Sequence, residues 1–253
     1  MRDPITRAEV RASFSRKIRD QAAVMMIGRP IADSVTPYFY NNGWTANGVT
    51  YLCMALSFSA IGILLVSNPY LYVFSALLMY AVFVLDCVDG NLARLTNSAS
   101  YYGKFMDGLS DGIYYFLAPF TVGLGLYLAG VPALWLLLGA IATSATLAGQ
   151  MVRNRYSFFR EWAIREKGPL TQDETARLVA AQRLEKFAGV VFVNCGFAGP
   201  VLLAIPYIGP KGFLIWSGLY HTACAFIFIA AAIWQGSIVL RRHRTSVRSA
   251  SSN

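Results

Sequence analysis

Charged residues are scarce in this sequence. They make up only 14% of its 253 residues, and hydrophobic residues make up 56%. A soluble domain carries about 25% charged residues. A chain with so few polar side chains cannot cover a folded surface in water. The composition therefore excludes an ordinary soluble domain and predicts an integral membrane protein.

Cysteine and histidine are also rare, with four and two residues. The cysteines lie far apart inside apolar segments, at Cys53, Cys87, Cys195 and Cys224. This spacing fits neither a zinc site nor a disulfide framework, so we interpret them as packing residues. The net charge of +9 does not indicate nucleic-acid binding, because the basic residues lie between apolar runs and at the chain ends.

Long apolar runs are the main feature that is present. A membrane-spanning helix needs about 20 mostly apolar residues. Six segments qualify, if two of them are allowed to contain aspartates: residues 46–66, 70–92, 103–127, 132–152, 187–208 and 213–238. The predicted fold class is therefore an all-α integral membrane protein with six transmembrane helices.

Lysine and arginine are distributed unevenly around these segments. With an even number of spans, both termini lie on one side, and that side holds 21 of the 22 basic residues, all but Lys211. Basic loops stay in the cytoplasm. We therefore expect a multi-pass protein, in the inner membrane if bacterial, with both termini cytoplasmic.

Three regions are expected along the chain. Residues 1–28 are predicted to form a juxtamembrane amphipathic helix that lies in the membrane interface. Its apolar stripe consists of Val10, Phe14, Ile18, Ala22 and Met25. Residues 29–240 would form the six-helix domain, and residues 241–253 a basic, Ser-rich cytoplasmic tail.

The longest polar stretch, residues 153–186, contains two local signals. Gly168 and Pro169 predict a break in the chain. Thr171 and Glu174 have the spacing of a capping box, which predicts that a short helix begins there.

Four aspartates lie close together in or beside the second and third spans. Asp86 and Asp89 are three residues apart, and Asp107 and Asp111 are four apart. Each pair therefore shares one helix face, and the polar turn between the spans brings the two pairs together. A charge near the bilayer centre costs about 2.5–3.5 kcal/mol, and the carboxylates also repel each other. The pattern thus predicts a divalent cation, Mg²⁺ or Mn²⁺, with two ions possible.

Small residues and an arginine accompany these aspartates. The full pattern is Asp86-x2-Asp89-Gly90-x2-Ala93-Arg94-x8-Gly103-x3-Asp107-x3-Asp111. It resembles the signature of the CDP-alcohol phosphatidyltransferase family at all eight defined positions. The six-span layout, with the pattern on the second and third spans, is similar to that family as well.

The resemblance implies a role for each residue. Asp86, Asp89, Asp107 and Asp111 would bind two Mg²⁺ or Mn²⁺ ions, and Asp111 would also act as the general base. The CDP pocket would be formed by Gly90, Ala93, Arg94 and Gly103, together with Asn47 and Thr50 at the start of the first span. The sequence departs from many family members at one position there, because Ala46 stands where they carry proline.

The implied reaction transfers a substituted phosphate group from a CDP-alcohol to an acceptor hydroxyl and releases CMP, in phospholipid biosynthesis. The donor would be CDP-diacylglycerol, or alternatively a small CDP-alcohol with a lipid alcohol as the acceptor. The pattern does not identify the acceptor. Lys104, Arg153 and Arg155 are candidates for binding a phosphorylated acceptor, although the two arginines also fit simple cytoplasmic anchors. The resemblance further implies a homodimer.

Two other classes of protein could account for the aspartates. A buried ion-pair network that supports packing would need more cations facing them within the spans. An ion or proton transporter also places carboxylates in the membrane, but usually distributes them over several spans near the midplane. The clustering on one hairpin favours the enzyme.

Overall fold

The computed structural model of the chain describes residues 3–13, 22–179, 183 and 205–240. For residues 22–27, 111–116 and 206 only the backbone is described. All regular structure in these parts of the chain is helical, without strands. The predicted all-α class is confirmed for them.

Four helices within the described residues are long and apolar enough to cross a membrane. They are α4 (Ala46–Leu64), α5 (Pro69–Leu95), α7 (Leu134–Lys167) and Tyr207–Val239, which is most of α10 (Ile205–Val239). They correspond to the first, second, fourth and sixth predicted spans.

The third and fifth predicted spans are not among these four helices. The third forms α6 (Tyr101–Leu128), and among its described side chains Leu117–Leu128 form an apolar stretch. Its 28 residues give a length of about 42 Å, more than the hydrocarbon core of about 30 Å. The fifth span, residues 187–208, lies largely outside the described residues. Six membrane crossings therefore stay a prediction.

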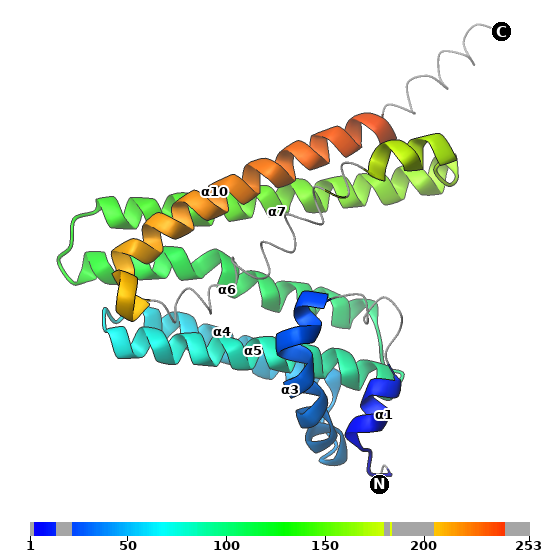
Figure 1. Ribbon diagram of the computed structural model, residues 1–253, viewed down its shortest axis with the longest axis horizontal. Coiled ribbons are helices and arrows are strands. Elements are labelled where there is room, and N and C mark those ends of the chain that lie inside the picture. The colour runs from blue at the N-terminus through cyan, green and yellow to red at the C-terminus, as the bar shows by residue number, and fades with distance from the viewer. Residues whose placement is uncertain (1–2, 14–21, 180–182, 184–204, 241–253) are drawn as a thin grey trace, which may run out of the picture.

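The helices pack side by side along the long axis of the molecule (Figure 1). α10 pairs with α7, α6 packs on α7, and α4 packs on both α5 and α6. α3 (Ala22–Asn41) crosses the outside of α5 at a steep angle. The C-terminal ends of α5, α7 and α10 all point to the end of the molecule where α1 (Arg7–Ala12) lies.

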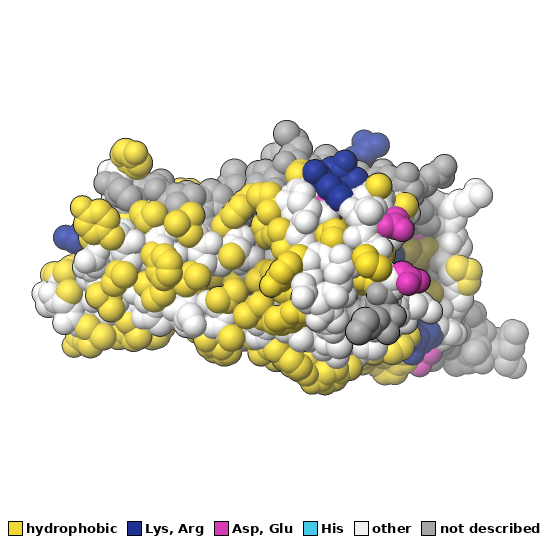
Figure 2. All heavy atoms as spheres, turned by 90° about the horizontal axis from the view of Figure 1, so that it is seen from below, with side chains coloured by type: hydrophobic (Ala, Val, Ile, Leu, Met, Phe, Trp, Pro, Cys, Tyr) yellow, Lys and Arg dark blue, Asp and Glu magenta, His cyan; other side chains and the backbone are white. Residues whose placement is uncertain are grey.

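Charged side chains gather at this same end of the molecule. On the face shown in Figure 2, most of the Lys, Arg, Asp and Glu side chains lie toward one end, with a basic group also at the opposite end, while hydrophobic side chains cover most of the remaining surface. This separation agrees with an apolar body in lipid and a charged end in water. Which side of the membrane that end faces stays a prediction.

The structure confirms some of the predictions for α7 and the segment that follows it, and corrects one. The fourth span was expected to end at residue 152, but the helix continues to Lys167. It ends where Gly168 adopts a φ of 80°, a left-handed conformation that glycine reaches without steric cost. The predicted capping box is confirmed: the Thr171 N–H donates to Glu174 Oε2 at 2.8 Å, and the Glu174 N–H donates to Thr171 Oγ1 at 3.3 Å.

The start of α4 shows that replacing the family's proline leaves the helix entry intact. α4 begins at Ala46 and is capped by Thr45, whose hydroxyl accepts a hydrogen bond from the Gly48 N–H at 3.0 Å. Proline favours a first helical position because its φ is preset. A side-chain cap satisfies an exposed backbone donor instead, so the helix starts at the expected residue.

The N-terminal region differs from the single amphipathic helix expected over residues 1–28. α1 ends at Ala12, and residues 14–21 lie outside the described residues. α3 then runs without a break across the expected boundary between residues 28 and 29. The three-region division of the chain therefore stays a prediction.

α1 packs on protein through part of its apolar stripe. Val10 is fully buried, and α1 contacts α3. Arg11 Nε lies 3.1 Å from Asp33 Oδ2, an ion pair between the two helices. Arg7 also donates to the Pro30 carbonyl at 3.2 Å. These contacts fix α1 against the outer side of α3.

Glycines allow the long helices to approach each other closely. A side chain at Gly139 of α7 would collide with the carbonyl of Pro119 in α6, and one at Gly125 of α6 would lie 2.7 Å from the Leu65 carbonyl oxygen. Small residues are typical of helix contacts in membranes, where lipid is as apolar as the side chains. These contacts hold α6, which carries half of the aspartates, between α4 and α7.

The substitution Gly139→Ala is expected to destabilise the protein by about 1–3 kcal/mol, the usual cost of overpacking. Thermal unfolding of the purified protein in detergent measures this effect. Gly62→Ala is the matched control, because nothing lies within 4 Å of the side chain that it adds. Equal unfolding temperatures for the two variants would contradict the close contact of α6 and α7.

Candidate active site

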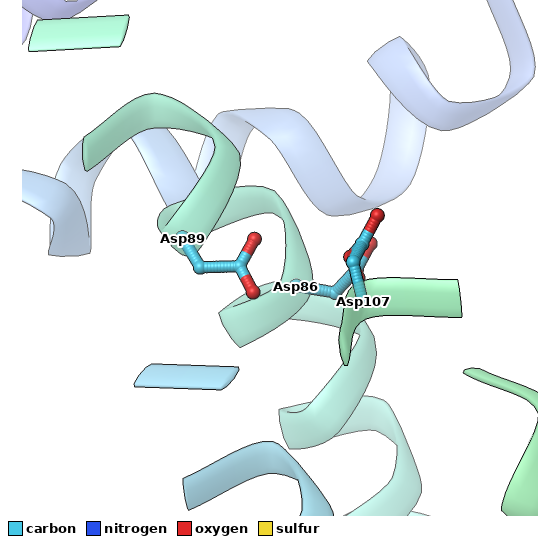
Figure 3. A group of neighbouring side chains, drawn as sticks. All are labelled: Asp86, Asp89 and Asp107. Carbon is cyan, nitrogen blue, oxygen red and sulfur yellow. The ribbon is translucent and has the colours of Figure 1, made fainter. Parts of the chain in front are cut away.

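Three of the four aspartates lie together where α5 meets α6. Asp86 and Asp89 come from α5 and Asp107 from α6, and their side chains converge (Figure 3). One carboxylate oxygen from each lies within 4.8 Å of the others. Asp89 is buried, whereas Asp86 and Asp107 are at least partly exposed. The hairpin predicted from the spacing is therefore formed.

The turn between α5 and α6 sets this geometry. α5 ends at Leu95, and Asn97 follows with a φ of 49°, a left-handed conformation that asparagine tolerates better than most residues. Ser100 then caps α6, because its hydroxyl accepts a hydrogen bond from the Gly103 N–H at 3.0 Å. The chain reverses within a few residues, so the two acidic helix faces stay side by side.

Thr50 fixes the most buried carboxylate. Its side chain is 4% exposed, and its hydroxyl donates to Asp89 Oδ2 at 2.6 Å. The contact joins α4 to α5, 39 residues apart in the chain. Thr50 was predicted to bind CDP, and the structure shows that it also orients a predicted metal ligand.

A pocket of about 200 Å³ opens beside the aspartates. All six residues that were predicted to bind the CDP group line it, and so does Lys104. The described residues that line it are Ala46, Asn47, Thr50, Asp89, Gly90, Ala93, Arg94, Ser98, Ala99, Ser100, Gly103, Lys104 and Asp107. The structure thus places residues from α4, α5 and α6 around one pocket. The sequence pattern grouped these residues but did not show that they meet in space.

The two glycines of the pattern leave space that other residues would fill. A side chain at Gly103 would lie 3.3 Å from Ser100 Oγ and 3.5 Å from Asn47 Oδ1. A side chain at Gly90 would lie 3.4 Å from an Arg94 guanidinium nitrogen. Larger residues at these positions would narrow the pocket and displace the polar groups that line it.

Asp111 is only partly described. It lies on α6 four residues after Asp107, and its side chain is outside the described residues. Helical spacing of four places it on the same face as Asp107. Its predicted roles as a metal ligand and as the general base therefore stay predictions.

The three candidates for the acceptor site are separated. Lys104 lines the pocket, whereas Arg153 and Arg155 do not. Both arginines are on α7, with the Arg153 guanidinium 5.5 Å from the centre of the Phe228 ring and that of Arg155 4.8 Å from the centre of the Phe159 ring. Cation–π contacts of this kind can hold a cation without any ligand.

The carboxylates fit a small divalent cation. Oxygens on opposite sides of one Mg²⁺ lie about 4.2 Å apart, so a spread of 4.8 Å needs only a small closure. Three charged oxygen donors match the hard ligands that Mg²⁺ and Mn²⁺ prefer. Asp86, Asp89 and Asp107 are the described residues that could hold such an ion.

A contribution from α3 was missed by the sequence analysis. Arg29 Nη1 donates to Asn91 Oδ1 at 2.9 Å, and Asn91 Nδ2 donates to the Thr36 hydroxyl at 2.9 Å. Asn91 stands at an undefined position of the signature, directly after Gly90. The available signal was the helical spacing of the polar residues Arg29, Asp33 and Thr36 in a segment that is otherwise mostly apolar.

Comparison with known proteins gives two kinds of similarity. Residues 44–181, more than half of the chain, match the CDP-alcohol phosphatidyltransferase family. The CDP-diacylglycerol–serine O-phosphatidyltransferases of two strains of Helicobacter pylori, 26695 and J99, are each 30% identical to the chain over 128 residues. Each alignment covers 48% of the chain and 51% of the relative, so the similarity spans about half the length of these enzymes.

The family match includes the whole hairpin that carries the aspartates, together with all of α4 and α7. It therefore covers every described residue that lines the pocket. A match over more than half of the chain, centred on this site, shows that the protein belongs to the CDP-alcohol phosphatidyltransferase family.

Proposed function

We propose that the protein transfers a phosphatidyl group from CDP-diacylglycerol to the hydroxyl group of a small polar acceptor and releases CMP, in phospholipid biosynthesis. The observation that carries this proposal is the group of three carboxylates beside a pocket that also presents Arg94 and Lys104. The similar enzymes of Helicobacter pylori are named for CDP-diacylglycerol and serine. Serine is therefore the first acceptor to test.

The donor diphosphate would be held by the positive charges of the site. Arg94 and Lys104 come from α5 and α6 on opposite sides of the turn, and both line the pocket. A guanidinium group can bind two phosphate oxygens at once, whereas an ammonium group acts as a point charge. Gly90, Ala93 and Gly103 leave the space in which the CDP group would lie.

Asp86, Asp89 and Asp107 would hold one Mg²⁺ or Mn²⁺ ion, and Asp111 would add a ligand for a second. Such ions, when bound, neutralise the diphosphate and stabilise the charge that develops at the attacked phosphorus. The Thr50 hydroxyl keeps the Asp89 carboxylate in a fixed orientation, so part of the ligand set is preorganised.

The reaction forms a bond between the acceptor oxygen and the phosphorus that carries the diacylglycerol. The bond between that phosphorus and the oxygen bridging to CMP breaks, and CMP leaves with the bridging oxygen. The acceptor proton passes to the Asp111 carboxylate, which acts as the general base. Arg94 would face the negative charge that builds up on the departing CMP.

The proposal includes a cytoplasmic active site and a homodimer. The first is supported by the charged side chains in Figure 2, most of which lie toward the end of the molecule where Figure 1 places the α5–α6 turn. The second rests on the family resemblance. Crosslinking in native membranes tests it, and a protein that stays monomeric there would remove this part of the proposal.

The reaction itself can be tested with the purified protein. CDP-diacylglycerol is incubated with serine, glycerol phosphate or inositol phosphate, and CMP release is measured with Mg²⁺, with Mn²⁺ and with a chelator. We expect serine-dependent CMP release that the chelator abolishes and either ion restores. A parallel reaction with a small CDP-alcohol and diacylglycerol tests the reverse arrangement. No CMP release from any pair would refute the proposal.

The aspartates can be separated by comparing Asp86→Asn with Asp111→Asn. Asp86→Asn removes a charged metal ligand, so donor affinity and metal affinity should both fall. Asp111→Asn keeps an oxygen but cannot take the acceptor proton. It should therefore bind the donor better than Asp86→Asn while losing turnover about 10²–10⁴-fold, as is typical of a missing general base.

Asp173→Asn is the matched control for these two variants, because Asp173 forms an exposed ion pair with Arg177 and does not line the pocket. Donor affinity and CMP release are measured for all three at saturating Mg²⁺ and Mn²⁺. Near-normal turnover of Asp111→Asn would show that another group takes the proton.

The three basic residues that the sequence analysis named for the acceptor site should differ in their effects. We expect Lys104→Ala to raise the apparent KM for CDP-diacylglycerol, because Lys104 lines the pocket in which the donor diphosphate would lie. Arg153→Ala and Arg155→Ala should change it less, since both guanidinium groups lie against aromatic rings of the protein. Steady-state kinetics with each substrate varied in turn measures this, and a larger effect at Arg153 or Arg155 would assign the acceptor site to α7.

A further inference from the structure

Asn91 is a fully buried polar residue beside the pocket, on α5 between Gly90 and Ala93. Its side-chain oxygen accepts two hydrogen bonds from arginines. Arg29 Nη1 of α3 lies 2.9 Å away, and Arg94 Nη2 of α5 lies 2.6 Å away. Asn91 does not line the pocket, whereas Arg94 does. Asn91 therefore contacts Arg94 from the buried side, away from the pocket.

The orientation of the Asn91 amide follows from its other partner. Asn91 Nδ2 lies 2.9 Å from Thr36 Oγ1, which lies 2.7 Å from the Ala32 carbonyl oxygen. A hydroxyl has one hydrogen to donate. Thr36 gives it to the carbonyl, so it can only accept from Asn91 Nδ2. The amide oxygen must then face the arginines, and a flipped amide would place its NH₂ group against two cations.

Arg94 is held by this arrangement on one side and by Gly90 on the other. A side chain at Gly90 would lie 3.4 Å from Arg94 Nη1, so the guanidinium group lies along the helix close to the Gly90 backbone. A free arginine side chain loses rotamer freedom when it binds a ligand. A guanidinium that is already fixed loses less, and preorganisation of this kind increases affinity.

We propose that Asn91 is a positioning residue: it holds the Arg94 guanidinium in the orientation that meets the donor's phosphate, and Thr36 of α3 keeps Asn91 in place. This inference rests on the proposed function, in which Arg94 faces the donor diphosphate. It also gives α3 a part in donor binding, although no described side chain of α3 lines the pocket.

The test is a double-mutant cycle between Asn91→Leu and Arg94→Ala, with CMP release measured over a range of CDP-diacylglycerol concentrations. Asn91→Leu removes the acceptor oxygen, so the donor KM should rise about tenfold or more, the size of a lost hydrogen bond to a charged group. The loss of kcat should be smaller, because a group lost from ground-state binding acts mainly on KM. In the Arg94→Ala background, Asn91→Leu should have no further effect on KM.

A merely structural role for Asn91 gives a different result. General loosening of α5 would raise KM by the same factor in both backgrounds, because effects at uncoupled sites add. That outcome overturns the positioning role and leaves the proposed function intact. If the unmodified protein releases no CMP with any donor, both proposals are refuted.

Two further variants keep the test decisive. Ser75→Ala also removes a buried hydrogen bond of α5, the one that the Ser75 hydroxyl donates to the Ala60 carbonyl, but Ser75 does not line the pocket. It should leave the donor KM unchanged. Thr36→Val removes the acceptor for Asn91 Nδ2 at constant size, and should raise the donor KM about two- to fivefold, less than Asn91→Leu. If Asn91→Leu does not fold, the test rests on Thr36→Val. An unchanged donor KM in that variant then overturns the proposal.

Discussion

Mutual repulsion of carboxylates is the constraint that the rest of the structure must satisfy. Asp86, Asp89 and Asp107 bring three acidic oxygens within 4.8 Å of one another, in helices that are otherwise apolar. The helix hairpin, the cap at Ser100 and the Thr50 hydrogen bond all hold this arrangement in place. Because repulsion raises the free energy of the three clustered carboxylates, a cation bound among them would lower it. The same repulsion that destabilises the fold would therefore favour metal binding.

The cluster is predictable from sequence because its determinants are local. Spacings of three and four residues decide which helix face a side chain occupies, and a short polar run between two apolar segments forces a hairpin. The capping box at Thr171 and the break at Gly168 are also set by neighbours within a few residues. The lining of the pocket follows once the hairpin is in place, since most of its residues lie within the pattern.

Features that depend on distant contacts were not predictable in the same way. Arg29 and Asn91 are 62 residues apart, and nothing local in the chain says that an arginine before the first span will meet an undefined position of the signature. The length of α7 was missed for another reason. Hydropathy reports where a segment is compatible with lipid, and it does not report where a helix ends. Residues 153–167 are too polar for a bilayer and are still helical.

The length of α7 has a mechanical consequence. Its 34 residues extend about 51 Å, well beyond a hydrocarbon core of about 30 Å. Membrane helices tilt to accommodate bilayers of different thickness. Because α7 is unbroken, tilting it by about 10° about one end would swing the other end sideways by about 9 Å. The end near Lys167 would thus amplify small differences in bilayer thickness, and α10, which packs along α7, would move with it.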